Sequence, residues 1–265
     1  MHRLSACLWS LRQPFRGAAT RARLAGFDCV DVRPDCWSGI ADQADASKLG
    51  VAVSCVGITP VQMAQGLSLE SLATTDAPYA VPYLTAALEQ GRRLGATRAY
   101  MVTPSGRVGD AAAYRDSIRA LADRAGALGM KLCIEPTPGR ALATSAEVLA
   151  FVRGLAQPAL HVLIDLGHNL ITGEDPAEAV KAADDRLGYV HIDDNDGKSD
   201  LHWGLFDGVL RPAVMDRFLA ALDFSGYDGT IGIEIRNSLP SPMTAVVASR
   251  DHVVEWGRRR TSGTS

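Results

Sequence analysis

The sequence predicts a single-domain (β/α)8 barrel of the TIM type, and three observations lead to that prediction. Eight short β-type runs alternate with alanine-rich helical runs along the chain. Several β-type runs, such as VAVSCV and HVLI, are apolar almost throughout, as in strands buried on both faces of a parallel sheet. The length of 265 residues is close to what such a barrel needs. A doubly wound open sheet is the alternative, and the number of strands favours the barrel.

Eight segments are expected to form the parallel strands. Each is short and rich in apolar residues, and each is followed by polar residues that turn the chain. The pattern predicts strands at residues 4–9, 29–33, 51–56, 98–103, 131–135, 160–165, 188–191 and 230–235. In a barrel, the carboxyl ends of all these strands would meet at one mouth, where active sites lie.

Helical runs lie between these segments and would cover the outside of the sheet. Their apolar residues recur at helical spacing, and Gly95 and Gly129 stand where a helix turns back into a strand. Pro176 and Pro212 occupy positions where prolines begin helices. The expected helices are residues 79–94, 111–128, 145–156, 176–183, 212–222 and 246–256.

The chain shows no break in composition, so residues 1–257 are predicted to form one catalytic TIM-barrel domain. Residues 258–265 begin with the basic triplet Arg258-Arg259-Arg260 and end in small polar residues. We expect them to form a flexible, solvated C-terminal tail.

Composition and charge narrow the class of protein. The net charge of −3 gives no sign of the basic excess that nucleic-acid-binding proteins use. No apolar run reaches the length of a membrane span, and the N-terminal residues lack the features of a signal peptide. The five cysteines are scattered without a Cys-x-x-Cys pair, so we expect reduced core thiols in a cytoplasmic protein. Nucleic-acid and membrane partners are therefore not expected.

Four consecutive strands end in groups that a buried sheet disfavours. Glu135 ends KLCIE, Asp165 ends HVLID, His191 lies in YVHID and Glu234 lies in GIEIR. Buried unpaired carboxylates are costly, and three of them meeting at one mouth would also repel each other. A divalent cation resolves that conflict, so we predict a metal site here. Oxygen ligands with one nitrogen suit Mn²⁺, Mg²⁺, Co²⁺ or Zn²⁺, and the lack of cysteine argues against a structural zinc site.

The segments CIEPTPG, LIDLGHN, VHIDDNDGKSDLHWGLFDG and GIEIR resemble those of the sugar phosphate isomerase/epimerase family, within the xylose isomerase-like barrel superfamily. The resemblance covers nearly the whole chain and is strongest over residues 131–236. It implies that Glu135, Asp165, His191 and Glu234 are the ligands of one divalent metal ion, with Mn²⁺ as the first candidate. It also implies a small carbohydrate or polyol as substrate, and relatives are often homo-oligomers.

The resemblance further implies residues that contact the substrate. His168 matches a histidine that usually contacts substrate near the metal. Asp200 and His202 match an Asp-x-His pair that supplies extra metal ligands in the DNA-repair nuclease branch but lies near the substrate in the sugar-processing branch. Arg140 is a candidate to anchor a distal oxygen or phosphate, with a plain loop cation as the alternative. Candidates to pack on a sugar face, each with an ordinary packing role as the alternative, are Trp203, Trp9, Trp37 and Phe206.

These features together predict a metal-dependent isomerase or epimerase that moves a proton through a metal-stabilised enediolate. Glu135 and Glu234 are the expected catalytic residues, one removing the α-proton and the other returning it on the opposite face. Ketose 3-epimerases often carry an arginine shortly after the histidine of the seventh strand, whereas this chain reads DDNDGKSD with Lys198 as the nearest cation. A dehydratase or lyase on the same site, including one that cleaves a C-glycoside, is therefore the alternative.

Two other classes fit the sequence less well. A DNA endonuclease of the nuclease branch needs two further histidines near the ends of the third and fourth strands, where this chain reads VAVSCVGI and RAYMVTPS. The acidic net charge also removes the phosphate attraction on which DNA binding depends. A non-catalytic sugar-binding protein would have no reason to keep mutually repelling carboxylates.

Overall fold

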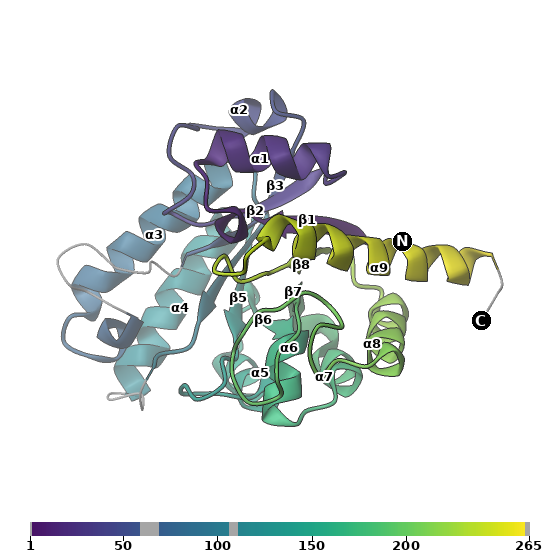
Figure 1. The fold of residues 1–265 in the computed structure, drawn as a ribbon. Helices are drawn as coiled ribbons and strands as arrows, with labels where there is room; N and C mark the ends of the chain where they lie inside the picture. Colours follow the sequence, from purple (N-terminus) through teal and green to yellow (C-terminus); the bar gives the residue numbers. More distant parts are fainter. Residues whose placement is uncertain (1, 59–68, 106–110, 263–265) are drawn as a thin grey trace.

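A computed structural model of the chain describes residues 2–58, 69–105 and 111–262 (Figure 1). In these residues eight parallel strands close into a barrel, each strand pairing with the next and β8 pairing back to β1. The strands are β1 (Arg3–Cys7), β2 (Cys29–Val32), β3 (Ala52–Gly57), β4 (Arg98–Val102), β5 (Lys131–Glu135), β6 (Leu160–Asp165), β7 (Leu187–Ile192) and β8 (Thr230–Ile233). The predicted barrel is confirmed, and no predicted strand end is more than two residues from the observed one.

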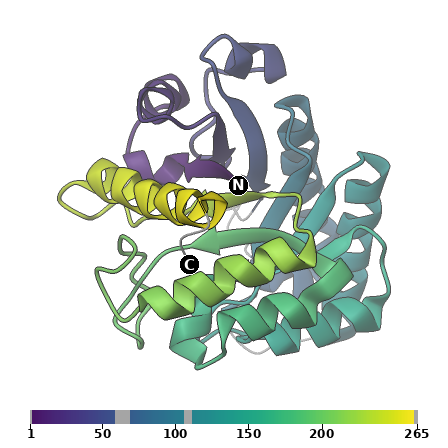
Figure 2. The same ribbon diagram turned by 90° about the vertical axis from the view of Figure 1, so that its right-hand side faces the viewer.

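Helices cover the outside of the barrel, as the two ribbon views show (Figures 1 and 2). They are α1 (Phe15–Leu24), α2 (Gln43–Ser47), α3 (Ala77–Arg93), α4 (Ala111–Ala127), α5 (Ser145–Leu155), α6 (Leu166–Thr172), α7 (Pro176–Ala183), α8 (Pro212–Ser225) and α9 (Pro242–Thr261). Neighbouring helices such as α3 and α4, or α7 and α8, pack against each other. All six predicted helices are present, whereas α1, α2 and α6 were not predicted. No described helix is both long and apolar enough to cross a membrane.

The last helix corrects the expected boundary at residue 258. Helix α9 continues to Thr261, so the arginine triplet is helical. Basic side chains at the C-terminal end of a helix interact favourably with its dipole. In addition, the Arg260 guanidinium lies 5.0 Å from the centroid of the Trp256 ring and 3.8 Å from a carboxylate oxygen of Asp223. Of the expected tail, residues 263–265 lie outside the described residues.

Two sets of buried side chains hold the fold together. The larger set fills the space between strands and helices, as the apolar strand runs predict. The smaller set fills the barrel itself and consists of Cys7, Trp9, Cys55, Tyr100, Cys133, Leu163 and Tyr189. The five cysteines are buried free thiols, as expected from their positions. The barrel is thus a packed core below a polar mouth, which is the usual arrangement in this fold.

Candidate metal centre and active site

Glu135, Asp165, His191 and Glu234 converge at the carboxyl end of the barrel. Glu135 ends β5, Asp165 ends β6, His191 lies near the end of β7 and Glu234 directly follows β8. One potential ligand atom from each lies within 4.8 Å of the others. Nδ1 of His191 is 2.9 Å from Oε2 of Glu234 and 3.3 Å from Oε1 of Glu135. The structure therefore brings together the four residues that the sequence predicts as metal ligands.

Burial disfavours the charged forms of the side chains in this cluster. Asp165 and His191 are fully buried, Glu135 is 2% exposed and the side chain of Glu234 is 13% exposed. Burial raises the pKa of Glu135, and the neighbouring Glu234 adds to the rise, although His191 opposes it. The pKa of Glu234 is lowered in spite of burial because the His202 and His191 imidazoles favour its charged form. Burial acts against the imidazolium of His191, yet Glu234 and its other neighbours raise the pKa of this group well above its usual range.

Asp165 tests whether a cation fits this cluster. Its Oδ1 caps helix α6 by accepting a hydrogen bond of 2.8 Å from the backbone N–H of His168. Its Oδ2 is buried and has no hydrogen-bond partner among the described residues. A buried acceptor left unpaired costs about 1–3 kcal/mol, and more when it is charged. Asp165, two glutamates and one imidazole together form a donor set that suits a divalent cation.

Three of the residues that the resemblance places near substrate lie together beside the cluster. Oδ1 of Asp200 is 2.9 Å from Nε2 of His202 and 3.3 Å from Nε2 of His168. The other ring nitrogens face fixed oxygens, since Nδ1 of His168 is 2.8 Å from Pro136 O and Nδ1 of His202 is 2.7 Å from Oδ2 of Asp193. The two imidazole rings are 5.7 Å apart at their centroids. The arrangement forms a polar wall, anchored on its far side, at the edge of the metal cluster.

Charge on this wall is set by its carboxylates. Burial acts against the imidazolium of His168, but Asp165 and Asp200 outweigh it and raise the pKa of His168 to about 10. Asp200 has a pKa well below its usual range, because hydrogen bonds from His168 and His202 outweigh its partial burial. His168 is therefore a hydrogen-bond donor toward the mouth at neutral pH.

The remaining predicted substrate contacts, Arg140 and Trp203, are fixed by other interactions. Nη1 of Arg140 donates to Thr103 O at 3.1 Å and to Ser105 Oγ at 3.2 Å, so this guanidinium braces the segment after β4. Trp203 is half-buried, and its backbone pairs with Asp194 through hydrogen bonds of 2.7 and 3.0 Å. These interactions do not support a substrate role for Arg140 or Trp203, and both roles stay predictions.

Sequence reasoning missed three residues around the cluster. Trp9, considered only as a stacking surface, donates its indole N–H to Oε1 of Glu234 at 2.8 Å. The ring of Tyr100 lies 4.9 Å from that of His191, nearly perpendicular to it at 86°. Asp31 is fully buried inside the barrel, 3.9 Å from Nε2 of His191. An acidic residue within the apolar run CVDV was the available signal for Asp31.

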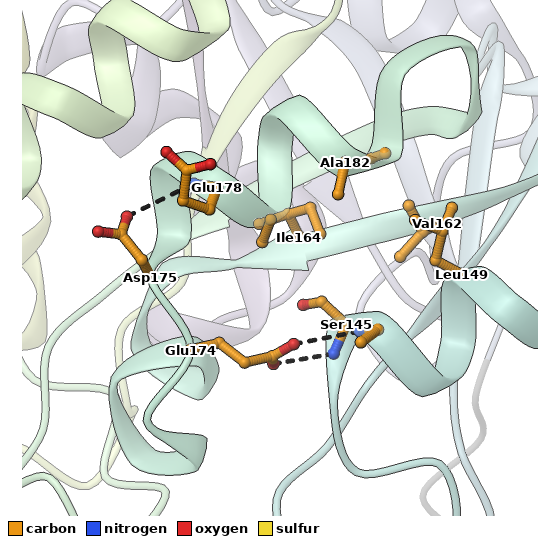
Figure 3. A pocket seen from close by; sticks show the side chains of 11 residues that line it. Ser145, Leu149, Val162, Ile164, Glu174, Asp175, Glu178 and Ala182 are labelled. Atoms are coloured by element: carbon orange, nitrogen blue, oxygen red, sulfur yellow. Dashed lines mark hydrogen bonds between the residues drawn. The ribbon is translucent and has the colours of Figure 1, made fainter.

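A hollow lies away from this mouth, on the outer face of β6 between α5 and α7 (Figure 3). Its volume is about 230 Å³, and Val162 and Ile164 form part of an apolar lining. The carboxylate of Glu174 at its rim accepts hydrogen bonds of 2.9 and 3.1 Å from the backbone N–H groups of Ser145 and Ala146 at the start of α5. This carboxylate therefore caps the start of α5. The residues that line the hollow form no cluster of reactive groups like the one at the barrel mouth.

Comparisons with known proteins agree with this architecture. A family model described as xylose isomerase-like TIM barrel matches residues 19–256. A D-psicose 3-epimerase of Agrobacterium fabrum is 29% identical over 140 residues, which make up 50% of this chain and 48% of that protein. An inosose dehydratase of Lacticaseibacillus casei is 27% identical over 131 residues, or 44% of each chain. The chain thus matches about half the length of these relatives or less.

A solved structure of an L-ribulose 3-epimerase superposes with a TM-score of 0.79 at 20% identity. The superposition covers 100% of this chain and 98% of the epimerase chain. At this level of identity, the likeness shows a shared fold.

Proposed function

The chain belongs to the xylose isomerase-like TIM barrel family, and from this premise we propose that it is a divalent-metal-dependent isomerase or epimerase. Its substrate would be a sugar, a sugar phosphate or a related polyol ketone. The observation that carries the proposal is the buried, unpaired Oδ2 of Asp165 within a cluster of two glutamates and a histidine. The similarity to a D-psicose 3-epimerase supports the class of substrate.

Four side chains would hold the ion: Glu135, Asp165, His191 and Glu234. Mn²⁺ is our first candidate, with Mg²⁺, Co²⁺ and Zn²⁺ as alternatives. When bound, the ion would supply a Lewis acid that stabilises negative charge developing on substrate oxygens.

Glu135 and Glu234 would carry the proton transfer. They come from β5 and from the end of β8, and Nδ1 of His191 lies between them. A substrate carbon at the mouth would therefore lie near two carboxylates that are attached to different strands. One carboxylate removes the proton next to the carbonyl, and the other returns a proton to the opposite face.

His168, Asp200 and His202 would orient the substrate. Their polar atoms gather within 3.3 Å of Oδ1 of Asp200, and Asp200 keeps 38% of its side chain exposed toward solvent. An imidazole held in its charged form would donate to a substrate hydroxyl or carbonyl oxygen the hydrogen bond that it otherwise makes to Asp200. Because the backbone N–H of His168 also holds Oδ1 of Asp165, substrate binding at His168 and metal geometry would be linked. Trp203 and Arg140 are further, weaker candidates for substrate contact.

A dehydratase is the second candidate function, and the similarity to an inosose dehydratase favours it. The stretch DDNDGKSD after β7 also offers only Lys198 as a cation, and that residue is exposed. If the substrate carries a leaving group next to the carbon that loses its proton, the same proton abstraction expels that group. Water leaves in that case, and no epimer forms.

Hydrogen exchange in D₂O tests the proposal. The Mg²⁺-loaded protein is incubated with D-psicose, D-fructose, L-ribulose, sugar phosphates and inososes, and the α-proton signals are followed by NMR. Exchange with formation of an epimer or isomer identifies the first function, and exchange with loss of water identifies the second. No exchange with any of these substrates would count against both.

Variants assign the exchange to the site. Glu135→Gln and Glu234→Gln are each expected to abolish it while leaving the fold intact. Glu178→Gln is the matched control, because Glu178 lies on the outer helix α7 and pairs only with Lys181 at 2.7 Å among the contacts described. Exchange that persists in either of the first two variants would remove that residue from the catalytic role.

A further inference from the structure

The barrel interior holds a carboxylate that the proposed reaction does not use. Asp31 lies on β2, fully buried, one strand position from apolar Val30 and Val32. Side chains that fill a barrel of this kind are usually apolar, since a buried carboxylate must be compensated. A charged residue in this position therefore calls for a physical reason.

Hydroxyl groups from three other strands compensate Asp31. Ser5 Oγ on β1 donates to its Oδ1 at 2.7 Å, Ser54 Oγ on β3 donates to the same oxygen, and Tyr189 OH on β7 lies 2.8 Å from both oxygens. The Cys7 thiol adds a weaker contact at 3.7 Å to Oδ2. Burial raises the pKa of Asp31, and His191 and these donors act against that rise. The surroundings are thus built to accept a carboxylate.

The same carboxylate faces the outer nitrogen of a proposed metal ligand. Nε2 of His191 is buried and has no hydrogen-bond partner among the described residues. Oδ2 of Asp31 is 3.9 Å away, about 1 Å beyond hydrogen-bond distance. On its other side, Nδ1 of this imidazole faces Glu135 and Glu234. The ring therefore lies between the metal cluster and Asp31.

Two features keep the ring in this place. Tyr100 and Tyr189 meet it nearly edge-on, with centroids 4.9 and 5.5 Å away. Gly232 on β8 leaves the space in which Asp31 and His191 approach each other. A Cβ at Gly232 would lie 2.7 Å both from Oδ2 of Asp31 and from Cδ2 of His191. Any larger residue would force the carboxylate and the ring apart.

We propose that Asp31 is a positioning residue that fixes the tautomer and orientation of His191, so that Nδ1 is free to bind the metal ion. An imidazole that binds a metal through Nδ1 carries its proton on Nε2, and that proton needs an acceptor. Asp31 and Cys7 each offer an atom within 4.8 Å of a ring nitrogen of His191, and Asp31 is the stronger acceptor because it is a carboxylate. This inference rests on the proposed metal site and assigns a role to a residue that does not touch the ion.

Metal affinity tests the inference without relying on activity. Metal-free wild type, Asp31→Asn and Ser54→Ala are titrated with Mn²⁺, and free Mn²⁺ is measured by electron paramagnetic resonance. Asp31→Asn is expected to bind about 10- to 100-fold more weakly, the usual effect of removing such an outer partner. Ser54→Ala is the matched control, because it removes one hydrogen bond from the same carboxylate but leaves the carboxylate facing His191. Its affinity is expected to stay within about 3-fold of wild type.

A second variant and a second measurement cover the case in which Asp31→Asn does not fold. Gly232→Ala keeps the carboxylate and its donors but separates it from the ring, so it should weaken Mn²⁺ binding in the same way. In Zn²⁺-loaded, ¹⁵N-histidine-labelled wild type, the Nε2 proton of His191 should give a downfield-shifted signal. That signal should move in the variants that disturb the pair and stay in place in Ser54→Ala.

Each outcome decides one of the two proposals. Equal Mn²⁺ affinities in wild type, Asp31→Asn and Gly232→Ala overturn the positioning role and leave the metal site standing. Equal losses in Asp31→Asn and Ser54→Ala also overturn it, because they would show a purely structural role. A wild type that binds no Mn²⁺ overturns the proposed metal site and the positioning role with it.

Discussion

Replacing Asp165 by asparagine should stabilise the metal-free protein and abolish metal binding. The amide keeps an oxygen in place of Oδ1, which caps α6 through the His168 N–H at 2.8 Å. In place of the unpaired Oδ2 it puts an NH₂ group, a donor beside carboxylates that have an oxygen within 4.8 Å of Asp165. The change therefore relieves a buried unpaired acceptor and removes one of three mutually repelling charges, and these gains must outweigh the lost attraction between Asp165 and the imidazolium of His168.

The size of the effect follows from the cost of an unpaired buried acceptor. That cost is about 1–3 kcal/mol, and for a chain of this length each kcal/mol shifts Tm by roughly 2–4 °C. The Tm of metal-free Asp165→Asn should therefore lie roughly 2–12 °C above that of the metal-free wild type. Mn²⁺ at 100 times its Kd should stabilise the wild type by about 2.7 kcal/mol and leave the variant unchanged.

Differential scanning calorimetry of chelator-treated proteins, with and without Mn²⁺, measures both effects. Asp175→Asn is the matched control, since Asp175 also caps a helix, α7, but its other oxygen pairs with Arg217 at 3.0 Å. That variant should be no more stable than the wild type and should keep its response to Mn²⁺. The reasoning is refuted if metal-free Asp165→Asn is less stable than metal-free wild type and still gains stability from Mn²⁺.

Three further predictions concern the metal cluster and a buried histidine near the start of β6. Trp9→Phe should weaken Mn²⁺ binding by about 10-fold or more, because a hydrogen bond to a charged acceptor contributes about 1.5–3 kcal/mol. Calorimetric titration with Mn²⁺ measures this loss, and an unchanged Kd would contradict the prediction. Burial lowers the pKa of His161 to about 4, so the unfolded chain takes up its proton first as the pH falls from 6.5 toward 4. The free energy of unfolding should therefore fall by about 3 kcal/mol over that pH range. In His161→Gln, the free energy of unfolding measured with urea at each pH should fall less over the same range. Finally, chelation should lower the Tm of wild type and not that of His191→Ala, and equal shifts would show that chelation acts elsewhere.

The fold could be predicted almost entirely because its signals are local. The apolar runs of β5 and β6 and the proline at the start of α7 mark their elements directly. Helix α1 was missed because three arginines in FRGAATRARL obscure its apolar side. Helix α6 was missed because Asp165 and Gly167 also suit a turn, whereas the Asp165 side chain begins a helix.

The candidate site could be predicted in part, for a physical reason. Glu135, Asp165, His191 and Glu234 share a position at strand ends, so a barrel brings them together whatever the details of packing. Asp31 and Trp9 depend instead on which way a side chain points across the barrel and on what it meets there. Such contacts join residues up to 225 positions apart and leave no pattern in the linear sequence.

A crystal structure of the protein grown with Mn²⁺ tests the central claim most directly. The anomalous difference map is expected to show one strong peak per chain, bounded by Glu135, Asp165, His191 and Glu234 at about 2.0–2.3 Å. A map with no peak among these four side chains, at Mn²⁺ concentrations that occupy other manganese sites, would contradict the account.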